Sequence, residues 1–427
     1  MSPQCKTEEV NDTKKLKILF IVRNFPTISE TFILNQIIYL INQGHYLRIL
    51  AINYKKTPLQ NQIEEYDLMN RVEFINMPPN LGKRFIKFLK LLRSHNFKKK
   101  ITLLNLLNPF KYGKESLNLA AFYKGSWINR FQDDFDIAHA HFGFTSDIFF
   151  KAKEVGFFKK TKLITSFHGH DMVVSEIKKN RKRYKELFSS NSILTTNNLY
   201  AKSLLLKIEP GYEPIHLLPV SLDTNLFDGR CINDSRNVKI VFCGRLVFWK
   251  GPHLFVEIAN FLINTKKIKN IEFEMIGEGK ERSHIESLIR EYNLQSYLKV
   301  RGSLKQNEII KIFRRSQIFV SPGLTDKNKR AETQGLVIQE AQAMQMPVLV
   351  STAGGMRFGI LEQESGFVLP EGDIKGFCDK IDFLINNPTI REEMGAKGRE
   401  YVVKNFDIIH LGKRLEGIYY EALKNDA

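Results

Sequence analysis

The chain has 427 residues, with 64 lysine and arginine residues against 46 aspartate and glutamate residues, so its formal net charge is +18 at pH 7. Hydrophobic residues make up 43% and charged residues 26%, a composition that excludes wholesale disorder. The length favours two domains, each long enough to bury its own core. No apolar run reaches the roughly 18 residues that a membrane-spanning helix needs, and the polar stretch 1–17 lacks the apolar region of a secretory signal.

The four cysteines lie far apart, at Cys5, Cys231, Cys243 and Cys378. This spacing matches neither a CxxC metal site nor a disulfide framework. We therefore expect free thiols, which fit a reducing cytoplasm.

The first half of the chain has the pattern of a β-α-β series. Residues 16–22 form a short apolar run typical of a strand buried on both faces, and residues 31–42 carry apolar side chains at helical spacing. Residues 47–52 predict a second strand, so the unit begins a parallel sheet. Further strands are expected at 72–75, 137–141, 163–167 and 192–195.

The pattern restarts after a polar, turn-rich linker at 223–237. Strands are expected at 238–243, 272–276, 299–300, 318–320 and 348–350, and helices at 253–265, 281–292, 308–315, 336–344 and 407–423. The predicted fold class is α/β, with two doubly wound Rossmann-like domains facing across a cleft. We expect a flexible N-terminus at 1–15, domains at 16–225 and 236–405, and a C-terminal helix at 406–427 that packs back towards the first domain.

Two glutamates eight residues apart carry the main chemical signal. Glu332 is expected in a loop and Glu340 inside a helix that begins near Gly335, where free N–H groups and the positive dipole end favour a phosphate. Upstream, Arg245 and Lys250 flank a strand-to-helix loop, as neutralising a leaving diphosphate requires. Together these groups predict a sugar-nucleotide site.

In their order and spacing these segments resemble the retaining glycosyltransferases of family 4, which have the GT-B fold. The resemblance rests on the G-R-L-x3-K-G loop at 244–251, the segments 276–279, 300–303, 319–322 and 347–350, and the E-x7-E helix. In the first half, segments 26–33 and 138–143 are similar to the branch that builds bacterial exopolysaccharides and other surface glycans, such as lipopolysaccharide. Segment 165–171 matches the H-G-x-D phrase of the family.

The resemblance implies an enzyme that transfers a sugar from a UDP- or GDP-sugar to a glycan or lipid-linked acceptor, with retention and without a metal cofactor. It assigns catalytic roles to His168 and Glu332, and donor binding to Arg245, Lys250, Gly277, Gly335, Leu336 and Glu340. Ser29 and Glu30 become candidates for the acceptor side, which is the first domain; the second domain binds the nucleotide sugar. The family usually has G-G-x-x-E beside the donor, whereas residues 354–358 end in Phe358, so the donor preference stays open.

Several residues have plainer alternatives. His139 with His141, and His168 with His170, alternate along strands and could bind a metal, although no cysteine or carboxylate cluster supports them. Asp134 and Asp136 spell the DxD of metal-dependent transferases but precede a strand, which favours a surface coincidence. His168 could instead be a packed core histidine, and Glu30 could be a carboxylate at a helix start.

Two other functions compete with sugar transfer. A nucleotide-sugar epimerase of the same fold would need acid and base residues that the sequence does not identify. A nucleic-acid-binding protein fits the basic charge, but no helix-turn-helix, RRM or zinc pattern supports it, and we expect no nucleic-acid partner.

The basic segment 83–100 predicts an amphipathic helix. Apolar residues Phe85, Phe88, Leu89 and Leu92 recur at helical spacing, and Lys83, Lys87, Lys90, Arg93 and Lys98–Lys100 take most other positions. Such a helix can lie in the interface of an anionic bilayer, which would make the protein peripheral on the inner leaflet of the cell membrane. The alternative is an ordinary helix whose apolar stripe packs on the sheet.

Overall fold

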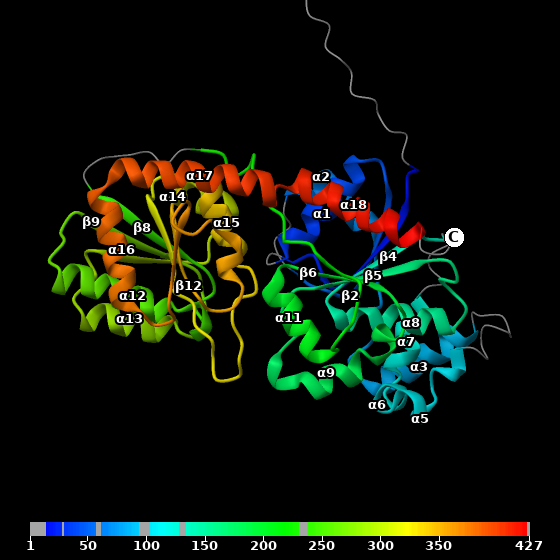
Figure 1. Ribbon diagram of the computed structural model, residues 1–427. Helices are drawn as coiled ribbons and strands as arrows, with labels where there is room; N and C mark the ends of the chain where they lie inside the picture. The colour runs from blue at the N-terminus through cyan, green and yellow to red at the C-terminus, as the bar shows by residue number, and fades with distance from the viewer. Residues whose placement is uncertain are drawn as a thin grey trace, which may run out of the picture. The chain divides into compact units, whose positions relative to one another are not determined.

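The computed structural model describes residues 14–27, 30–56, 61–93, 103–127, 134–229 and 237–424. Helices alternate with strands, and the strands form two sheets (Figure 1). The strand order is β3-β2-β1-β4-β5-β6-β7 in one sheet and β10-β9-β8-β11-β12-β13 in the other. Neighbouring strands such as β1 and β2, or β8 and β9, run parallel, which confirms the predicted doubly wound α/β class.

The seven-stranded sheet takes its strands from the first half of the chain. They are β1 (Lys17–Phe25), β2 (Tyr46–Tyr54), β3 (Val72–Phe74), β4 (Ile137–His141), β5 (Lys162–Phe167), β6 (Ile193–Thr196) and β7 (Ile215–Leu217). The helices of this half include α1 (Thr31–Asn42), α2 (Asn61–Glu65), α3 (Leu81–Arg93), α5 (Pro109–Tyr112), α6 (Lys114–Leu117), α7 (Ala120–Ser126), α8 (Ser146–Glu154), α9 (Ile177–Arg183), α10 (Lys185–Phe188) and α11 (Leu199–Ile208).

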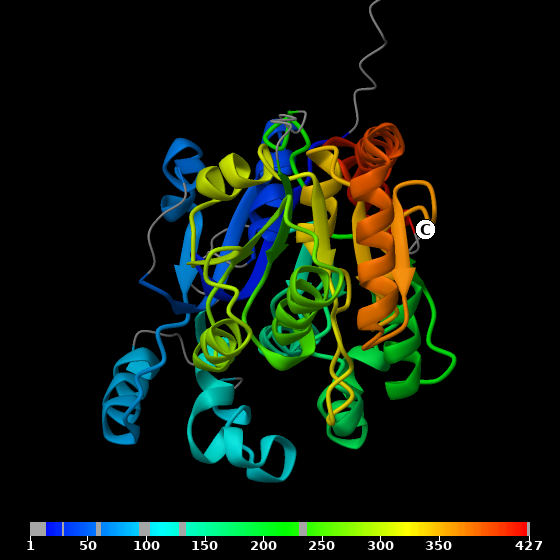
Figure 2. The same cartoon turned by 90° about the vertical axis from the view of Figure 1, so that its left-hand side faces the viewer.

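The six-stranded sheet takes its strands from the second half. They are β8 (Val238–Cys243), β9 (Ile271–Ile276), β10 (Leu298–Gly302), β11 (Ile318–Ser321), β12 (Val348–Ser351) and β13 (Gly366–Leu369). The helices are α12 (Pro252–Asn260), α13 (Arg282–Glu291), α14 (Gln306–Phe313), α15 (Leu336–Ala343), α16 (Ile374–Asn386), α17 (Pro388–Phe406) and α18 (Ile408–Lys424). Figure 2 shows this half from the side, with α16 and α17 in orange to red.

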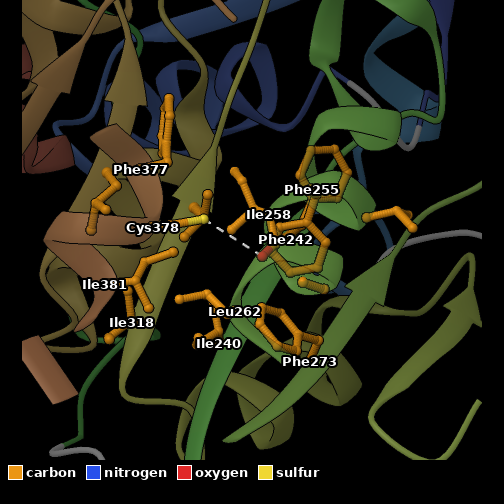
Figure 3. Packing of buried hydrophobic residues seen from close by; sticks show 14 of the residues in the cluster. Ile240, Phe242, Phe255, Ile258, Leu262, Phe273, Ile318, Phe377, Cys378 and Ile381 are labelled. Carbon is orange, nitrogen blue, oxygen red and sulfur yellow. Dashed lines mark hydrogen bonds between the residues drawn. The ribbon is translucent and has the colours of Figure 1, made fainter. Parts of the chain in front are cut away.

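Both faces of the six-stranded sheet are apolar because helices cover each of them. On β8, Ile240 and Phe242 face one buried cluster and Val241, between them, faces the other. Figure 3 shows the first cluster, which α12, α13 and α16 complete; there the Cys378 thiol lies 3.6 Å from the carbonyl oxygen of Ile258. Cys378 and Cys243 are free thiols, whereas Cys5 and Cys231 lie outside the described residues.

Several elements depart from the sequence predictions. Strands β7 and β13, of three and four residues, were not predicted. Glycine begins β13, since a Cβ on Gly366 would lie 2.0 Å from the carbonyl oxygen of Val348 on the neighbouring strand. The helix predicted over 253–265 is α-helical only to Asn260 and ends in a π-helical turn, Phe261–Thr265.

The chain divides into two compact units. The first consists of the described parts of 1–28, 37–139 and 148–163, and the second of those of 29–36, 140–147 and 164–427. The predicted domain boundaries stay a prediction. Within the second unit, the C-terminal helix α18 reaches β7, where Glu421 Oε1 lies 3.2 Å from His216 Nε2. Among the described residues, no helix combines the length and apolarity needed to cross a bilayer.

Candidate active site

A pocket of the second compact unit brings together three residues predicted from the sequence. His168 directly follows β5, Arg245 follows β8, and Glu332 lies in the loop between β11 and α15; all three line the pocket. Ligands of parallel sheets bind beyond the carboxyl ends of the strands, which is where these residues lie. Their catalytic and binding roles stay predictions.

Lys250 is held at the edge of this site by Glu332. Its ammonium contacts the Glu332 carboxylate. The Lys250 side chain is 17% exposed and that of Glu332 is 16% exposed. Burial and, to a smaller extent, the nearby Arg245 lower the pKa of Lys250 to about 8. With a pKa of about 8, the Lys250 ammonium is charged near neutral pH and forms an ion pair with Glu332.

The backbone of Glu332 is fixed by the glycine pair at 354–355. Gly355 N–H donates to the Glu332 carbonyl oxygen at 2.8 Å. A Cβ on Gly354 would lie 2.1 Å from the same oxygen, and one on Gly355 would lie 1.9 Å from the Thr333 carbonyl oxygen. Only glycine permits the backbone at 354–355 to come this close to the 332–333 backbone. Gly354 and Gly355 therefore support Glu332 even though Phe358 stands where the family usually has the glutamate of G-G-x-x-E.

The remaining predicted donor residues lie outside the lining of this pocket. Gly335 precedes α15 with a φ of 78°, Leu336 begins the helix, and Glu340 lies in its second turn. Burial raises the pKa of Glu340 to about 7. Gly277 follows β9, where a Cβ would lie 1.9 Å from the carbonyl oxygen of Gly244 after β8, so the two strand-end loops touch through glycine.

The ring of His168 is engaged at both nitrogens. Nδ1 lies 3.2 Å from Asn197 Oδ1, and Nε2 lies 3.2 Å from His141 Nδ1. Because an amide oxygen only accepts, Nδ1 of His168 carries the proton, and Nε2 accepts from His141. Burial lowers the pKa of His168 to about 4, despite the opposing bond to Asn197, so the ring is neutral near pH 7.

The histidines do not pair as their alternation along the chain suggested. His141 stacks on His168 with 5.4 Å between ring centroids, whereas His139 packs against Phe20 at 5.1 Å. No group of three histidine, cysteine or acidic side chains suited to a metal ion occurs in the part of the chain that the structure describes.

Asp171 holds the turn that carries His168. Its carboxylate accepts from the backbone N–H groups of Gly143 at 2.8 Å, Gly169 at 2.9 Å and His168 at 3.2 Å. Burial raises the pKa of Asp171 to about 6, and these backbone bonds oppose the shift. The aspartate of the H-G-x-D phrase thus ties the His168 turn to the end of β4.

Two other predicted residues, Glu30 and Asp136, do not line the pocket. Glu30 precedes α1 and accepts at its carbonyl oxygen from Ile33 N–H at 3.0 Å, whereas Ser29 lies outside the described residues. Asp136 accepts from Lys17 N–H at 2.8 Å and from Lys14 Nζ at 3.0 Å. This aspartate therefore anchors the start of β1, in agreement with a structural reading of the DxD sequence.

Residues 231–401 match the family model described as glycosyl transferases group 1. The chain carries a glycosyl transferases group 1 domain and is a glycosyltransferase. It is 25% identical over 414 residues to the putative colanic acid biosynthesis glycosyltransferase WcaL of Salmonella typhimurium, covering 94% of this chain and 99% of that protein.

Solved structures agree on the fold. A glycosyltransferase from Rickettsia africae superposes with a TM-score of 0.70 at 19% identity, over 96% of this chain and all of that one. Anabaena HepE, solved in complex with UDP, gives 0.69 at 14% identity, over 95% of this chain and 100% of its own. The GT-B fold predicted from the sequence is thereby confirmed.

Sequence reasoning missed part of this glycosyltransferase's pocket. Trp249, Lys329 and Arg330 line it, and Asn197 orients His168 from outside the lining. Trp249 stands inside the same G-R-L-x3-K-G loop that drew attention to Arg245, and residues 327–330 form a basic run, so both signals were present in the sequence. Asn197 carries no such signal.

Proposed function

We propose that the protein transfers a sugar from a nucleoside-diphosphate sugar to a glycan or lipid-linked acceptor, with retention of configuration, in the biosynthesis of a cell-surface polysaccharide. The observation that carries this proposal is the meeting of His168, Arg245 and Glu332 in one pocket, with Lys250 paired to Glu332. The similarity to WcaL, named for colanic acid biosynthesis, supports the class of product, and HepE, solved with UDP, supports a UDP-sugar as the donor.

In this proposal the donor lies between the loops after β8 and the start of α15. Arg245 and Lys250 neutralise the leaving diphosphate, and the free N–H groups from Gly335 and Leu336 add the positive end of the helix dipole. Glu340 accepts from the ribose hydroxyls, and Gly277 lets the backbone after β9 approach the donor. Two cations and a helix start supply the charge stabilisation, so no metal is required.

Glu332 and His168 orient the transferred sugar. A neutral His168 suits hydrogen bonding to a sugar hydroxyl better than a second positive charge would. Glu332 is a poor nucleophile because its carboxylate is paired with Lys250, so we favour front-face attack over a covalent intermediate. The acceptor oxygen bonds to the anomeric carbon, the bond from that carbon to the diphosphate breaks, and the acceptor proton passes to the departing phosphate oxygen.

The acceptor approaches from the side of Glu30 in this proposal. Glu30 belongs to the same compact unit as His168, and Phe32, two residues later, packs on the His168 ring at 4.6 Å between centroids. A carboxylate there can accept from an acceptor hydroxyl.

The test is a panel of UDP, GDP and their sugars, measured as protection against thermal unfolding. One nucleotide class should stabilise the wild type, and Glu340→Ala should lose that protection, whereas Glu393→Ala, which removes an exposed helical glutamate of α17, should keep it. No protection by any nucleotide would contradict the proposal. Product analysis with one labelled donor separates transfer from epimerisation, because an epimerase leaves the sugar on its nucleotide.

We further propose that α3 docks on an anionic membrane, such as the inner leaflet of the cell membrane. The helix predicted near residue 83 is present, and Phe88 packs against Phe122 with 4.7 Å between ring centroids. Phe85 and Ile86 remain 54% and 59% exposed, and Lys83, Lys90 and Arg93 are exposed on the same helix. The apolar stripe is therefore only partly used for packing.

Cosedimentation with phosphatidylglycerol vesicles tests the docking. Each basic residue near an anionic surface contributes about 1 kcal/mol, so Lys83→Gln, Lys90→Gln and Arg93→Gln together should abolish binding at moderate salt. Changing three exposed lysines of the second half to glutamine, Lys267 and Lys269 in the loop before β9 and Lys299 in β10, should leave binding intact. If the wild type does not cosediment with these vesicles even at low salt, the docking proposal is contradicted.

A further inference from the structure

The pocket holds more positive charge than its acidic groups can balance. Arg245, Lys329 and Arg330 line it, and Lys250 lies beside it. Against these four cations stand two acids, Glu332, which contacts Lys250, and Asp326, which pairs with Arg330. Lys329 and Arg330 are exposed, but clustered cations repel one another, and an anion between them relieves that repulsion. The pocket is therefore built to receive negative charge.

Two guanidinium groups lie against one indole ring. The guanidinium carbon of Arg330 is 4.5 Å from the centroid of Trp249, and that of Arg245 is 5.8 Å from it. The ring face attracts each cation and holds the two like charges near one another at the pocket wall. Planar guanidinium groups presented in this way suit a carboxylate or a phosphate.

The segment that carries Lys329 and Arg330 is held in place before any ligand arrives. The buried carboxylate of Asp326 accepts from Asn328 N–H at 2.8 Å, from Arg330 N–H at 2.9 Å and from Arg330 Nε at 2.7 Å. Leu324 N–H donates to the Trp249 carbonyl oxygen at 2.9 Å and joins this segment to the Trp249 loop. A preorganised site loses less entropy on binding.

Arg245, which is assigned to the donor diphosphate, also lines this pocket, whereas Lys329 and Arg330 have no part in that assignment. Lys250, Gly335 and Glu340 do not line the pocket, whereas Met172, Tyr200 and Leu204 do. Apolar and aromatic side chains beside polar ones are typical of saccharide-sized ligands. Lys329 and Arg330 are therefore better suited to bind a saccharide with an acidic group than to bind the donor diphosphate.

We propose that Lys329 and Arg330, with the guanidinium of Arg330 held on Trp249, bind an anionic group of the acceptor saccharide. The shared chemistry is a carboxylate of an acidic sugar or a phosphate on the saccharide. This proposal deepens the proposed function and rests on it.

The probes are methyl β-glucuronoside, glucose 1-phosphate and, as the neutral match, methyl β-glucoside. Binding to the wild type is followed by ligand-observed NMR, with and without UDP. Lys329→Gln with Arg330→Gln should weaken binding of the preferred anionic probe at least tenfold and leave UDP affinity unchanged. The control is Lys327→Gln with Lys404→Gln, which removes the same charge at exposed positions, one of them in the same segment, that do not line the pocket.

Each outcome supports or overturns the proposal. Preference for the glucuronoside identifies a carboxylate as the recognised group, and preference for glucose 1-phosphate identifies a phosphate. Equal binding of the neutral glycoside, equal binding by the double variant, or no binding of either anion overturns the subsite. A loss of UDP affinity in the double variant also overturns it, because the cations would then serve the donor. Failure of the wild type to bind any nucleotide would instead overturn the proposed function.

Discussion

Replacing Asp171 with alanine should destabilise the protein because three backbone donors, one of them buried and two partly buried, depend on that one carboxylate. The N–H groups of Gly143, Gly169 and His168 all donate to it, and only 2% of Asp171 is exposed. Each buried donor left without an acceptor costs about 1–3 kcal/mol. Because the two donors on the 168–169 turn are only partly buried, we expect a loss of about 3–4 kcal/mol in the free energy of unfolding.

Asparagine at the same position gives a graded comparison. It keeps one oxygen for His168 and Gly169 but turns an NH₂ group towards Gly143, so about 1–2 kcal/mol should be lost. Denaturant unfolding followed by circular dichroism measures both variants, with the exposed Asp134→Ala as control. An alanine variant as stable as the wild type would refute the view that Asp171 ties down the His168 turn.

Three further predictions concern the same site. Gly355→Ala should abolish nucleotide protection, because its Cβ would meet the Thr333 carbonyl oxygen at 1.9 Å and push the Glu332 segment away; unchanged protection would show that the approach is not needed. EDTA should leave transfer unchanged, and complete loss restored by Mn²⁺ would revive Asp134 and Asp136. The folded pKa of His168, about 4, lies below its unfolded value of 6.5, so its contribution is fully present above pH 6.5 and lost as the pH falls towards 4. Between pH 7 and 4 the free energy of unfolding of the wild type should therefore fall by up to about 3 kcal/mol more than that of His168→Gln. Equal pH dependence of the two unfolding free energies would contradict the lowered pKa of His168.

Long, strongly patterned elements were predictable from the sequence. Helix α1 and strands β4 and β8 match their predicted bounds. In each, apolar residues follow a regular pattern and a change of pattern marks the end of the element. Strands β7 and β13 were missed; β7 pairs with β6 and β13 with β12, and such pairings depend on the fold and not on the local sequence pattern. The π-helical end after Asn260 likewise depends on packing, which periodicity does not report.

The site was predictable as a set of residues but not as a set of contacts. Glu332 and Arg245 were singled out from the charges around a helix start and a strand-to-helix loop, and His168 from the resemblance of the H-G-x-D phrase to the family. The contact of Lys250 with Glu332 was not foreseen, although both residues had been singled out, since the spacing of two loops does not fix side-chain partners. The pairing of His141 with His168 joins two parallel strands, whereas alternation along one strand suggested pairs within each.

The most direct test of the account is the release of nucleoside diphosphate from the nucleotide sugar that protects the protein best, measured with and without a glycan acceptor. Lys250→Ala should slow release at least tenfold, which corresponds to about 1.4 kcal/mol of transition-state stabilisation. Lys311→Ala, at an exposed position of α14, should release nucleoside diphosphate as fast as the wild type. Turnover of Lys250→Ala equal to that of the wild type, in a folded protein, would contradict the assignment of this site to sugar transfer.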